Sequence, residues 1–513
     1  MNQDAIAIFD AKEKFVFKMD ADPYYAPNPY VAENGFLTQQ TEDAPLPRYD
    51  DIRERLPQPV WDGHEDAINC YDWTWKTAFG NLRPANSQSR FVSNYIDCAF
   101  SDFSFMWDSA FIVMFGKYAN HIFNFQKTLD NFYSHQHRDG FISRQLFQHT
   151  EGARYSRDDP SSTGPNILPW AEWEYYCTTK DVERLKKVFA PLCGYHKWLQ
   201  LNRTWQNGGY WSNGLACGMD NQPRLAPGYD VIVSHGFMTW IDTCAQQYLS
   251  AEILVKIAEI LGREADVAWL QEERDFLKKL INGQMWDEKT AFYYDMLRDG
   301  KLTTTKSIGA YWTMLAGICP EEWSESFVAH LDNEAEFKRT FRIPSLSADH
   351  PEYDEKGDYW RGGVWAPTNY MVLKALDRYG YQTLAYEIAC NYVENVVKIF
   401  DREGTIYENY SSEHLCKGDP ARRDFVGWTG LAPITILFEY VFGIRPDAAN
   451  KKIVWHVNCL ERHGVCQYPL GDQLIDLICE ARNSAEEEPR ITVRGDVTVE
   501  VIWNGKRMLL QGE

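Results

Sequence analysis

Two short segments, far apart in the chain, each place a carboxylate among groups suited to binding a polyol. Asp220 lies in the sequence CGMDNQPR, and Glu408 lies in YENY. Hydrolysis of a glycosidic bond commonly uses two carboxyl groups, one to protonate the leaving oxygen and one to activate water. Taken alone, each acid is more typical of a turn or surface loop, and Glu403 and Glu413 compete with Glu408. The pair makes glycoside hydrolysis a hypothesis that other parts of the chain have to support.

Two aromatic clusters offer further groups for holding a sugar. Asp108, within FMWDSAF at a predicted helix start, could accept hydrogen bonds from two hydroxyls beside an aromatic platform. Arg361, within YWRGGVWAPTNY, presents a rigid fork of donors. Aromatic faces also stack on the C–H faces of sugars, although packing is the commoner use of any one Trp. Arg144, Gln145 and Trp170 are weaker candidates.

In their order along the chain, these segments resemble the inverting glycosidases that include trehalases, processing α-glucosidases and mannosylglycerate hydrolases. Trp107-Asp108-Ser109 is similar to the WDS or WDT of that family, and RGGVWAP is similar to its RG-x-x-W-x-P stretch. MDN with PR resembles the segment of its catalytic acid, and ENY followed by VGWT resembles its closing segment. The resemblance spans about residues 60–442. Ala216-Cys217 stands where a Glu-Ser pair is common, and a glycine-rich run is absent, which argues against a trehalase.

The resemblance implies an inverting glycoside hydrolase that cleaves an α-linked glucoside or mannoside. By the same resemblance Asp220 is the general acid, Glu408 is the general base, and neither a metal nor another cofactor takes part. The residues expected to contact the sugar are Phe105, Trp107, Asp108, Arg144, Gln145, Trp170, Asn221, Arg224, Arg361, Trp365, Asn369, Tyr410 and Trp428.

The elements that must position these residues are mainly helical. Hydrophobic periodicity predicts twelve helices, near 64–82, 105–118, 120–133, 166–178, 181–202, 236–261, 264–282, 306–317, 320–332, 364–378, 381–400 and 426–441. Pro191 is expected to interrupt the fifth. Twelve helices in sequential pairs favour a mainly α fold, an (α/α)6 toroid of six helical hairpins, with a solenoid of helical pairs as the structural alternative.

The two ends of the chain differ from this helical body. Residues 1–60 are rich in proline and are predicted to form an extended N-terminal arm, so that the barrel catalytic domain covers 61–445. Residues 446–513 contain alternating and β-branched stretches and the turn signal Asn504-Gly505, which predict a small β-rich C-terminal appendage. Residues 287–301 are predicted to form a β-hairpin between helices.

Composition limits the possible partners. A net charge of −21 argues against nucleic acid and against anionic membranes, and it leaves a small carbohydrate substrate as the expected partner. The 12 cysteines have no metal-ligand spacing and are expected to be reduced. No signal peptide is evident in the chain as given, so a cytoplasmic location is expected unless a leader was removed. The sequence leaves the oligomeric state open.

Three other functions stay open at this point. A sugar epimerase or isomerase on the same toroid would use histidines such as His235 and His414 as acid and base. A catalytically inactive carbohydrate-binding protein would bind sugar without turnover, with Asp220 or Glu408 pointing away from the cleft. A rhamnosidase-like hydrolase would share the barrel but not these motifs.

Overall fold

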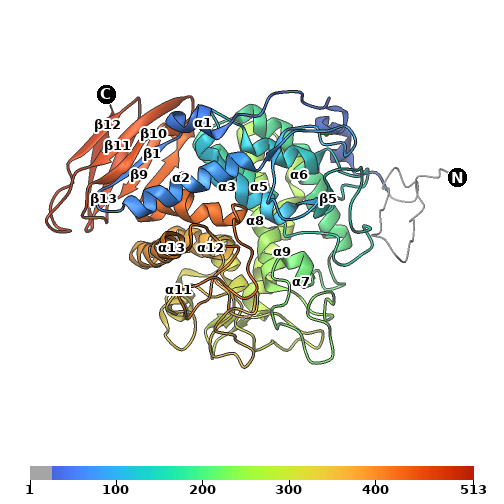
Figure 1. The fold of residues 1–513 in the computed structure, drawn as a ribbon. Helices are drawn as coiled ribbons and strands as arrows, with labels where there is room; N and C mark the ends of the chain where they lie inside the picture. Colours follow the sequence, from blue (N-terminus) through green and yellow to red (C-terminus); the bar gives the residue numbers. More distant parts are fainter. Residues whose placement is uncertain (1–25, 513) are drawn as a thin grey trace.

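The computed structural model describes residues 26–512, and its core is mainly helical, as the sequence predicts (Figure 1). The first 25 residues of the predicted arm lie outside the described part. The remainder of the arm carries only short elements: η2 (Pro29–Glu33), η3 (Gly35–Thr38), α1 (Tyr49–Ile52), η4 (Arg53–Arg55) and β1 (Gln58–Trp61).

All twelve segments predicted to be helical contain helical turns. The principal helices are α2 (Glu65–Gly80), α3 (Met106–Gly116), α4 (Asp130–Tyr133), α5 (Leu168–Thr179), α6 (Val182–Asn202), α8 (Ile241–Leu261), α9 (Trp269–Gln284), α10 (Trp312–Leu315), α11 (Glu321–Ala329), α12 (Ala366–Arg378) and α13 (Gln382–Glu403). The last predicted helix is a 3-10 turn, η10 (Trp428–Leu431), that continues into a π-helix, η11 (Ala432–Val441). The short helix α7 (Gly214–Cys217) was not predicted.

The expected break at Pro191 is wrong, because α6 runs through this residue without interruption. A proline inside a helix removes one backbone hydrogen bond and costs about 3 kcal/mol. Val188, Phe189 and Leu192, the neighbours of Pro191, are fully or almost fully buried, and α6 packs against both α5 and α8. Burial of each such side chain contributes about 1.5–3 kcal/mol, which is enough to offset the loss.

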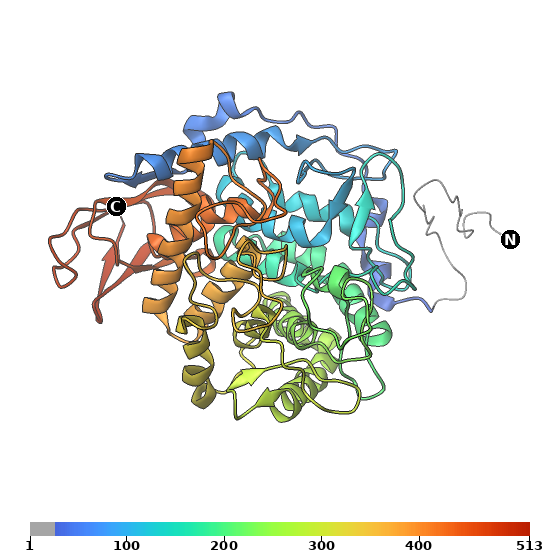
Figure 2. The same ribbon diagram turned by 60° about the horizontal axis from the view of Figure 1, so that its bottom comes forward.

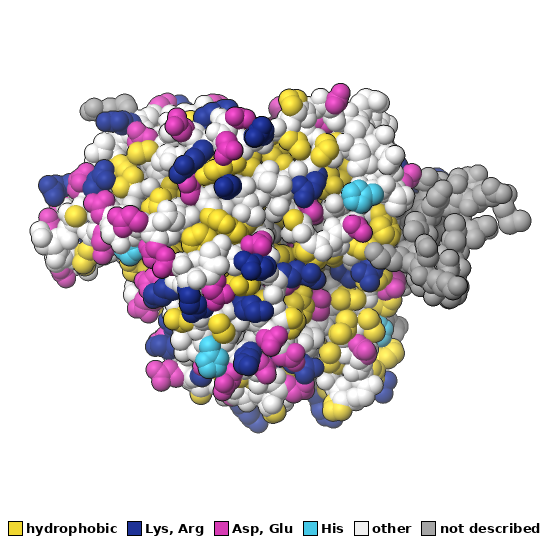
Figure 3. Space-filling view, in the orientation of Figure 1, with side chains coloured by type: hydrophobic (Ala, Val, Ile, Leu, Met, Phe, Trp, Pro, Cys, Tyr) yellow, Lys and Arg dark blue, Asp and Glu magenta, His cyan; other side chains and the backbone are white. Residues whose placement is uncertain are grey.

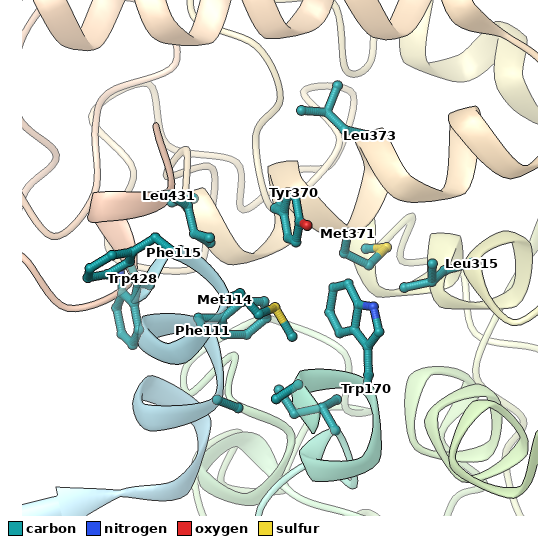
Figure 4. Packing of buried hydrophobic residues seen from close by; sticks show 14 of the residues in the cluster. Phe111, Met114, Phe115, Trp170, Leu315, Tyr370, Met371, Leu373, Trp428 and Leu431 are labelled. Carbon is teal, nitrogen blue, oxygen red and sulfur yellow. The ribbon is translucent and has the colours of Figure 1, made fainter. Parts of the chain in front are cut away.

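Six helical elements form a closed circuit of contacts around the centre of the molecule. In order, α3 packs against α5, α5 against α8, α8 against α10, α10 against α12, α12 against η10, and η10 against α3. Helices α6, α9 and α13 pack outside this circuit, on α8, α8 and α12 respectively. Figure 2 views the same helices from below, and Figure 4 shows side chains from α3, α5, α10, α12 and η10 meeting in the core.

Strands gather at the C-terminal end of the chain. The first sheet has the order β1-β10-β11-β12, with β10 (His463–Leu470), β11 (Gln473–Cys479) and β12 (Ile491–Arg494). The second has the order β14-β13-β9-β8, with β8 (Ile444–Asp447), β9 (Lys452–His456), β13 (Thr498–Trp503) and β14 (Lys506–Gln511). Because β1 pairs with β10, the end of the N-terminal arm is part of the first sheet.

Two predicted turns are present. Asn504 and Gly505 join β13 to β14 with φ of +42° and +73°, the left-handed conformations that this dipeptide adopts readily in hairpins. The hairpin predicted over 287–301 corresponds to β6 (Trp286–Asp287) paired with β7 (Phe292–Tyr293). Within residues 26–512, none of the helices is long and apolar enough to span a membrane.

Candidate active site

A cavity of about 370 Å³ brings three carboxylates together above the ends of the central helices. Asp108 stands in the first turn of α3, Asp220 lies in the loop between α7 and α8, and Glu408 lies between α13 and η10. Five other residues expected to contact sugar also line this cavity: Phe105, Trp107, Arg144, Gln145 and Trp428. The two carboxylates proposed from sequence therefore face one space, as the hydrolysis hypothesis requires.

The loop that carries Asp220 is folded tightly against the wall of the cavity. Asn213 caps α7 by accepting a hydrogen bond from the Ala216 N–H at 2.8 Å. Gly218 ends this helix with φ of +80°, and a Cβ on it would lie 3.0 Å from the Trp107 ring. Glycine is thus needed here both for the backbone conformation and for the close approach to the indole. The turn that follows presents Asp220 to the cavity.

Asn221 and Arg224, expected to bind sugar, instead hold the Asp220 loop in place. The Asn221 side chain donates to the Asp358 carbonyl at 2.7 Å and accepts from the Trp360 N–H at 2.9 Å. Arg224 is buried and pairs with two acids, Asp242 at 3.0 Å and Asp295 at 2.8 Å. Neither residue lines the cavity, and the side chains of both bond to protein groups instead.

Glu408 is 3% exposed and is held by donors from two different segments. The Tyr359 hydroxyl donates to Oε1 and the Arg422 backbone N–H donates to Oε2, both at 3.2 Å. The Trp428 indole N–H donates to the Glu408 carbonyl at 2.8 Å, which fixes the backbone. Tyr359 has φ of +68°, a left-handed conformation that costs a non-glycine residue about 1–3 kcal/mol.

The neighbouring acids Glu403 and Glu413 differ from Glu408 in their surroundings. Glu403 pairs with Arg402 and accepts from the Tyr407 hydroxyl, while Glu413 pairs with Arg339. These partners hold the pKa of both acids below the ordinary value, whereas burial raises the pKa of Glu408. Of the three, Glu408 alone lines the cavity among the described residues.

Burial also raises the pKa values of the other two cavity acids. Burial raises the pKa of Asp220 to about 6, with the Arg144 charge opposing this and the Glu408 charge adding to it. Burial raises the pKa of Asp108 to about 8, although the Cys98 thiol, 3.3 Å from Oδ1, partly opposes it. Near neutral pH the cavity therefore holds a mainly protonated Asp108 and an Asp220 of which a minority is protonated. Perturbed carboxyl groups grouped in a cleft are typical of catalytic sites.

Five further residues expected to contact sugar do not line the cavity. Trp170 packs in the core, stacked on Tyr370 at 5.8 Å, and its indole N–H donates to Glu174. Trp365 lies behind Trp360 with the rings 3.9 Å apart and nearly parallel. The others are occupied by protein contacts: Arg361 pairs with Glu352, Asn369 bonds the Ile343 backbone, and the Tyr410 hydroxyl accepts from the Tyr407 N–H.

Several lining residues were not predicted to contact sugar: Phe100, Ser101, Phe103, Arg154, Tyr155, Gly164, Pro165, Leu215, Gly218, Tyr359, Trp360 and Arg422. Tyr359 and Trp360 belong to the YWRGGVWAP segment, so their neighbourhood was recognised although their role was not. Arg154 lies over Phe103 at 5.6 Å, and Arg422 lies over Phe100 at 4.3 Å. No pattern in the sequence distinguishes these arginines from surface arginines.

Comparisons with known proteins show the family to which the chain belongs. The chain belongs to the mannosylglycerate hydrolase MGH1-like glycoside hydrolase domain family, whose model matches residues 101–425, and the chain is thus a glycoside hydrolase. An uncharacterized protein of Borreliella burgdorferi is 25% identical over 374 residues, covering 71% of this chain and 76% of that protein.

Two further similar proteins have names that state an activity. A probable mannosyl-oligosaccharide glucosidase of Schizosaccharomyces pombe is 23% identical over 51% of this chain, and the match spans only 35% of that protein. The crystal structure of a mannosylglycerate hydrolase from Thermus thermophilus with glucose superposes with a TM-score of 0.58 at 17% identity, covering 71% of this chain and 99% of that one. At this identity the superposition shows a shared fold.

No group of three or more potential metal ligands is found among residues 26–512. The cavity itself is lined by three acids, by aromatic rings and by the arginines Arg144, Arg154 and Arg422.

Proposed function

We propose that the protein is an inverting hydrolase of an α-linked glucoside or mannoside, with Asp220 as general acid and Glu408 as general base. The observation that carries the proposal is the placement of these two carboxyl groups, from loops almost two hundred residues apart, on one aromatic-walled cavity. Their surroundings support different roles, since no protein donor to the Asp220 carboxyl other than its own backbone is found among the described residues, while Glu408 accepts from two donors.

The reaction is a single displacement, in which the protonated Asp220 gives its proton to the glycosidic oxygen as the bond to the anomeric carbon breaks. A pKa of about 6 keeps part of Asp220 protonated near neutral pH, where an ordinary aspartate would be ionised. Gly218 and Trp107 set the position of this loop, and Asn221 ties it to the segment that carries Tyr359.

In the same step, ionised Glu408 takes a proton from the water molecule that attacks the opposite face of the anomeric carbon. Hydrogen bonds from Tyr359 and from the Arg422 backbone favour the ionised form, and burial makes the carboxylate more basic than an exposed one. Attack from the opposite face inverts the configuration, so an α-glycoside would release a β-sugar. Asp108, protonated near neutral pH, can both donate to and accept from a sugar hydroxyl.

Arginines on the cavity wall make glycosides with an acidic aglycone candidate substrates. Arg144, Arg154 and Arg422 all line the cavity, and burial keeps Asp108 uncharged near pH 7. These positive charges lie on the cavity wall although the net charge of the whole chain is −21. The Thermus relative named mannosylglycerate hydrolase makes mannosylglycerate one test compound, beside neutral α-glucosides and α-mannosides.

We further propose that the helical body is an (α/α)6 toroid, with the cavity at the end where the central helices begin. The closed circuit of contacts supports this, because its members alternate along the chain with the outer helices α6, α9 and α13. Loops preceding α3, α5, α12 and η10 supply most of the lining residues, which places the cavity at a single end of the circuit.

The deciding experiment incubates the protein with α-glucosides, α-mannosides, mannosylglycerate and an α-rhamnoside, and follows the first anomer released by NMR. Initial release of the β-anomer from a glucoside or mannoside, abolished in Asp220→Asn and Glu408→Gln but not in Glu413→Gln, is expected. Initial release of the α-anomer would contradict the role of Glu408. Turnover of the rhamnoside alone would favour the rhamnosidase-like alternative.

An epimerase or isomerase has less support. The described residues that line the cavity include no histidine, and His235 and His414 lie elsewhere. His414 is exposed beside Glu355, and His235 belongs to a separate aromatic cluster.

A further inference from the structure

A second hollow, with a volume of about 590 Å³, lies on the surface beside the loop that carries Asp220. It shares no lining residue with the catalytic cavity. Trp205 and Phe237 form its aromatic wall, and Gln206, Gln284 and Arg298 form part of its polar rim. Figure 3 shows hydrophobic side chains at the lower right of the molecule, where Figure 1 draws the loops beside α7. The hollow therefore combines aromatic faces with planar polar groups.

The aromatic wall extends into a larger cluster, which we call the aromatic platform: Trp205, Trp211, Tyr229, His235 and Phe237. The rings of Trp205 and Phe237 are stacked at 24°, with centroids 6.2 Å apart, and His235 fits edge-on against both. Phe237 is 47% exposed and Tyr229 is 37% exposed. Phe237 and Tyr229 thus pack against each other while remaining exposed, and the other three rings of the platform are half-buried.

Phe237 is held outward at a conformational cost. Its φ is +52°, directly after Gly236 at +61°, and a bulky residue in this region is strained by about 1–3 kcal/mol. Its N–H donates to His235 Nδ1 at 3.0 Å, and the Trp205 indole N–H donates to the Met238 carbonyl at 2.8 Å. The Trp205 indole N–H therefore already has an acceptor, and the aromatic rings present their faces to a ligand in the hollow. A strained, half-exposed aromatic residue is more readily explained by binding than by core packing.

The polar rim is available to a ligand as well. Among the described residues, the side chains of Gln206, Gln284 and Arg298 have no recorded hydrogen bond or ion pair. The lining of the hollow includes no carboxylate, although acids outnumber bases in the chain by 73 to 52. This chemistry suits an uncharged ligand with many hydroxyl groups and apolar C–H faces, since amides and guanidinium groups bind hydroxyls while aromatic faces stack on the ring.

We propose that this hollow is a second carbohydrate-binding site, which holds a neutral oligosaccharide chain outside the catalytic cavity. The platform is continuous with the catalytic loop: Asn213, the cap of α7, also donates to the Val233 carbonyl at 3.0 Å, and the Leu215 N–H donates to the Ile232 carbonyl at 3.1 Å. A glycan held here is anchored to the segment that positions Asp220, which suits an enzyme acting on a sugar attached to a longer chain or surface.

The test uses the full chain with Asp220→Asn, so that probes are not consumed, in native gels containing amylopectin, yeast α-mannan or dextran. At least one polysaccharide is expected to retard this protein. Adding Phe237→Asn, which keeps a residue tolerant of positive φ, or Gln284→Ala should weaken the apparent affinity at least fivefold. Adding Leu509→Ser, which alters a side chain 69% exposed on β14, should leave the retardation unchanged.

Three results would overturn the proposal. These are no retardation by any of the polysaccharides, equal retardation of the Phe237 and Leu509 variants, or a dimer in sedimentation that Phe237→Asn dissociates while sugar binding is absent. The last result would assign the platform to a second copy of the chain. With Asp220 intact, Phe237→Asn alone should hydrolyse a small α-glycoside within twofold of the unaltered protein. Because gel binding needs no turnover, failure of the proposed hydrolysis would leave this test intact.

Discussion

The two ends of the central helices both bury carboxylates, but with opposite electrostatic consequences. At the cavity end, Asp108 stands in the first turn of α3, and burial raises its pKa to about 8. At the other end, Lys117 directly follows α3 and pairs with Glu439 of the π-helix η11 at 2.7 Å. Although burial alone would raise the pKa of Glu439, the charges of Lys117 and Lys374 bring it well below the ordinary value.

The contrast lies in the partners. The far end pairs two acids, Glu174 and Glu439, with two lysines, Lys117 and Lys374, and the hydroxyls of Tyr118 and Tyr370 donate to Glu439. The cavity end leaves its three acids without comparable cationic partners. Arg422 Nε is 3.8 Å from Glu408, and its side chain is half-exposed. The same burial thus produces a neutral ionic network in one place and acids able to exchange protons in the other.

The largest expected effect comes from removing a catalytic carboxyl group at the cavity end. Asp220→Asn should lower kcat by about 10²–10⁴-fold for a glycoside with an alkyl or sugar leaving group, because the leaving oxygen receives no proton. With a 2,4-dinitrophenyl glycoside, whose leaving group needs no proton, the loss should be much smaller. Glu408→Gln should affect both substrates alike, since attack by water is impaired in each case. Steady-state kinetics measure this, and equal losses for the two substrates in Asp220→Asn would exclude its role as general acid.

The second-largest effect is expected from removing one lysine of the ionic network at the far end. Lys117→Met leaves Glu439 with a lost partner and should destabilise the fold by about 3–5 kcal/mol, measured by urea unfolding. The loss should shrink as pH falls through the lowered pKa of Glu439, because its ionised form is stabilised only in the folded state and only above that pKa. Lys117→Met combined with Glu439→Gln should recover part of the stability. An unchanged midpoint in the single variant would show that the network contributes little.

A third, smaller effect distinguishes the two ends in sign. Asp108→Asn should stabilise the protein by about 0.5–2 kcal/mol at pH 9 while lowering activity. The folded pKa of about 8 exceeds the ordinary value of 3.8, so the unfolded chain releases this proton first and stability falls as pH rises from 3.8 to about 8. An asparagine carries no such penalty, and the gain should therefore be smaller at pH 6. Exposed Asp102→Asn is the control and should change the unfolding midpoint little at either pH.

The sequence predicted the helices and the motifs of the site better than the role of each residue within a motif. Helical periodicity located the twelve helical segments most clearly where outer helices such as α9 and α13 bury one face over several turns. The motifs identified Asp220, Glu408 and the aromatic residues around Asp108. They could not separate residues that line the cavity from residues such as Trp365 or Asn369 that brace it from behind, since both kinds stand in the same motif. Arg154 and Arg422 reach the cavity only through tertiary packing, which leaves no local pattern.

The smallest expected effect comes from removing a single hydrogen bond at the cavity end, the one from Tyr359 to Glu408. The activity of the unaltered protein should follow a bell-shaped pH profile: it is lost as pH rises through the Asp220 pKa of about 6, and lost as pH falls through the raised pKa of Glu408. Tyr359→Phe removes a donor that lowers the Glu408 pKa, so the acid limb of kcat/KM should move to higher pH and the alkaline limb should stay in place.

The loss of this one hydrogen bond, worth about 1 kcal/mol, should lower kcat about fivefold. Tyr407→Phe is the matched control, because the Tyr407 hydroxyl donates at 2.7 Å to Glu403, which does not line the cavity. Movement of the alkaline limb in Tyr359→Phe, or an equal shift of the acid limb in Tyr407→Phe, would show that Tyr359 acts on the site as a whole. A shift confined to the acid limb and to Tyr359→Phe would assign the ionisation at low pH to Glu408, since the Tyr359 hydroxyl reaches that carboxylate directly.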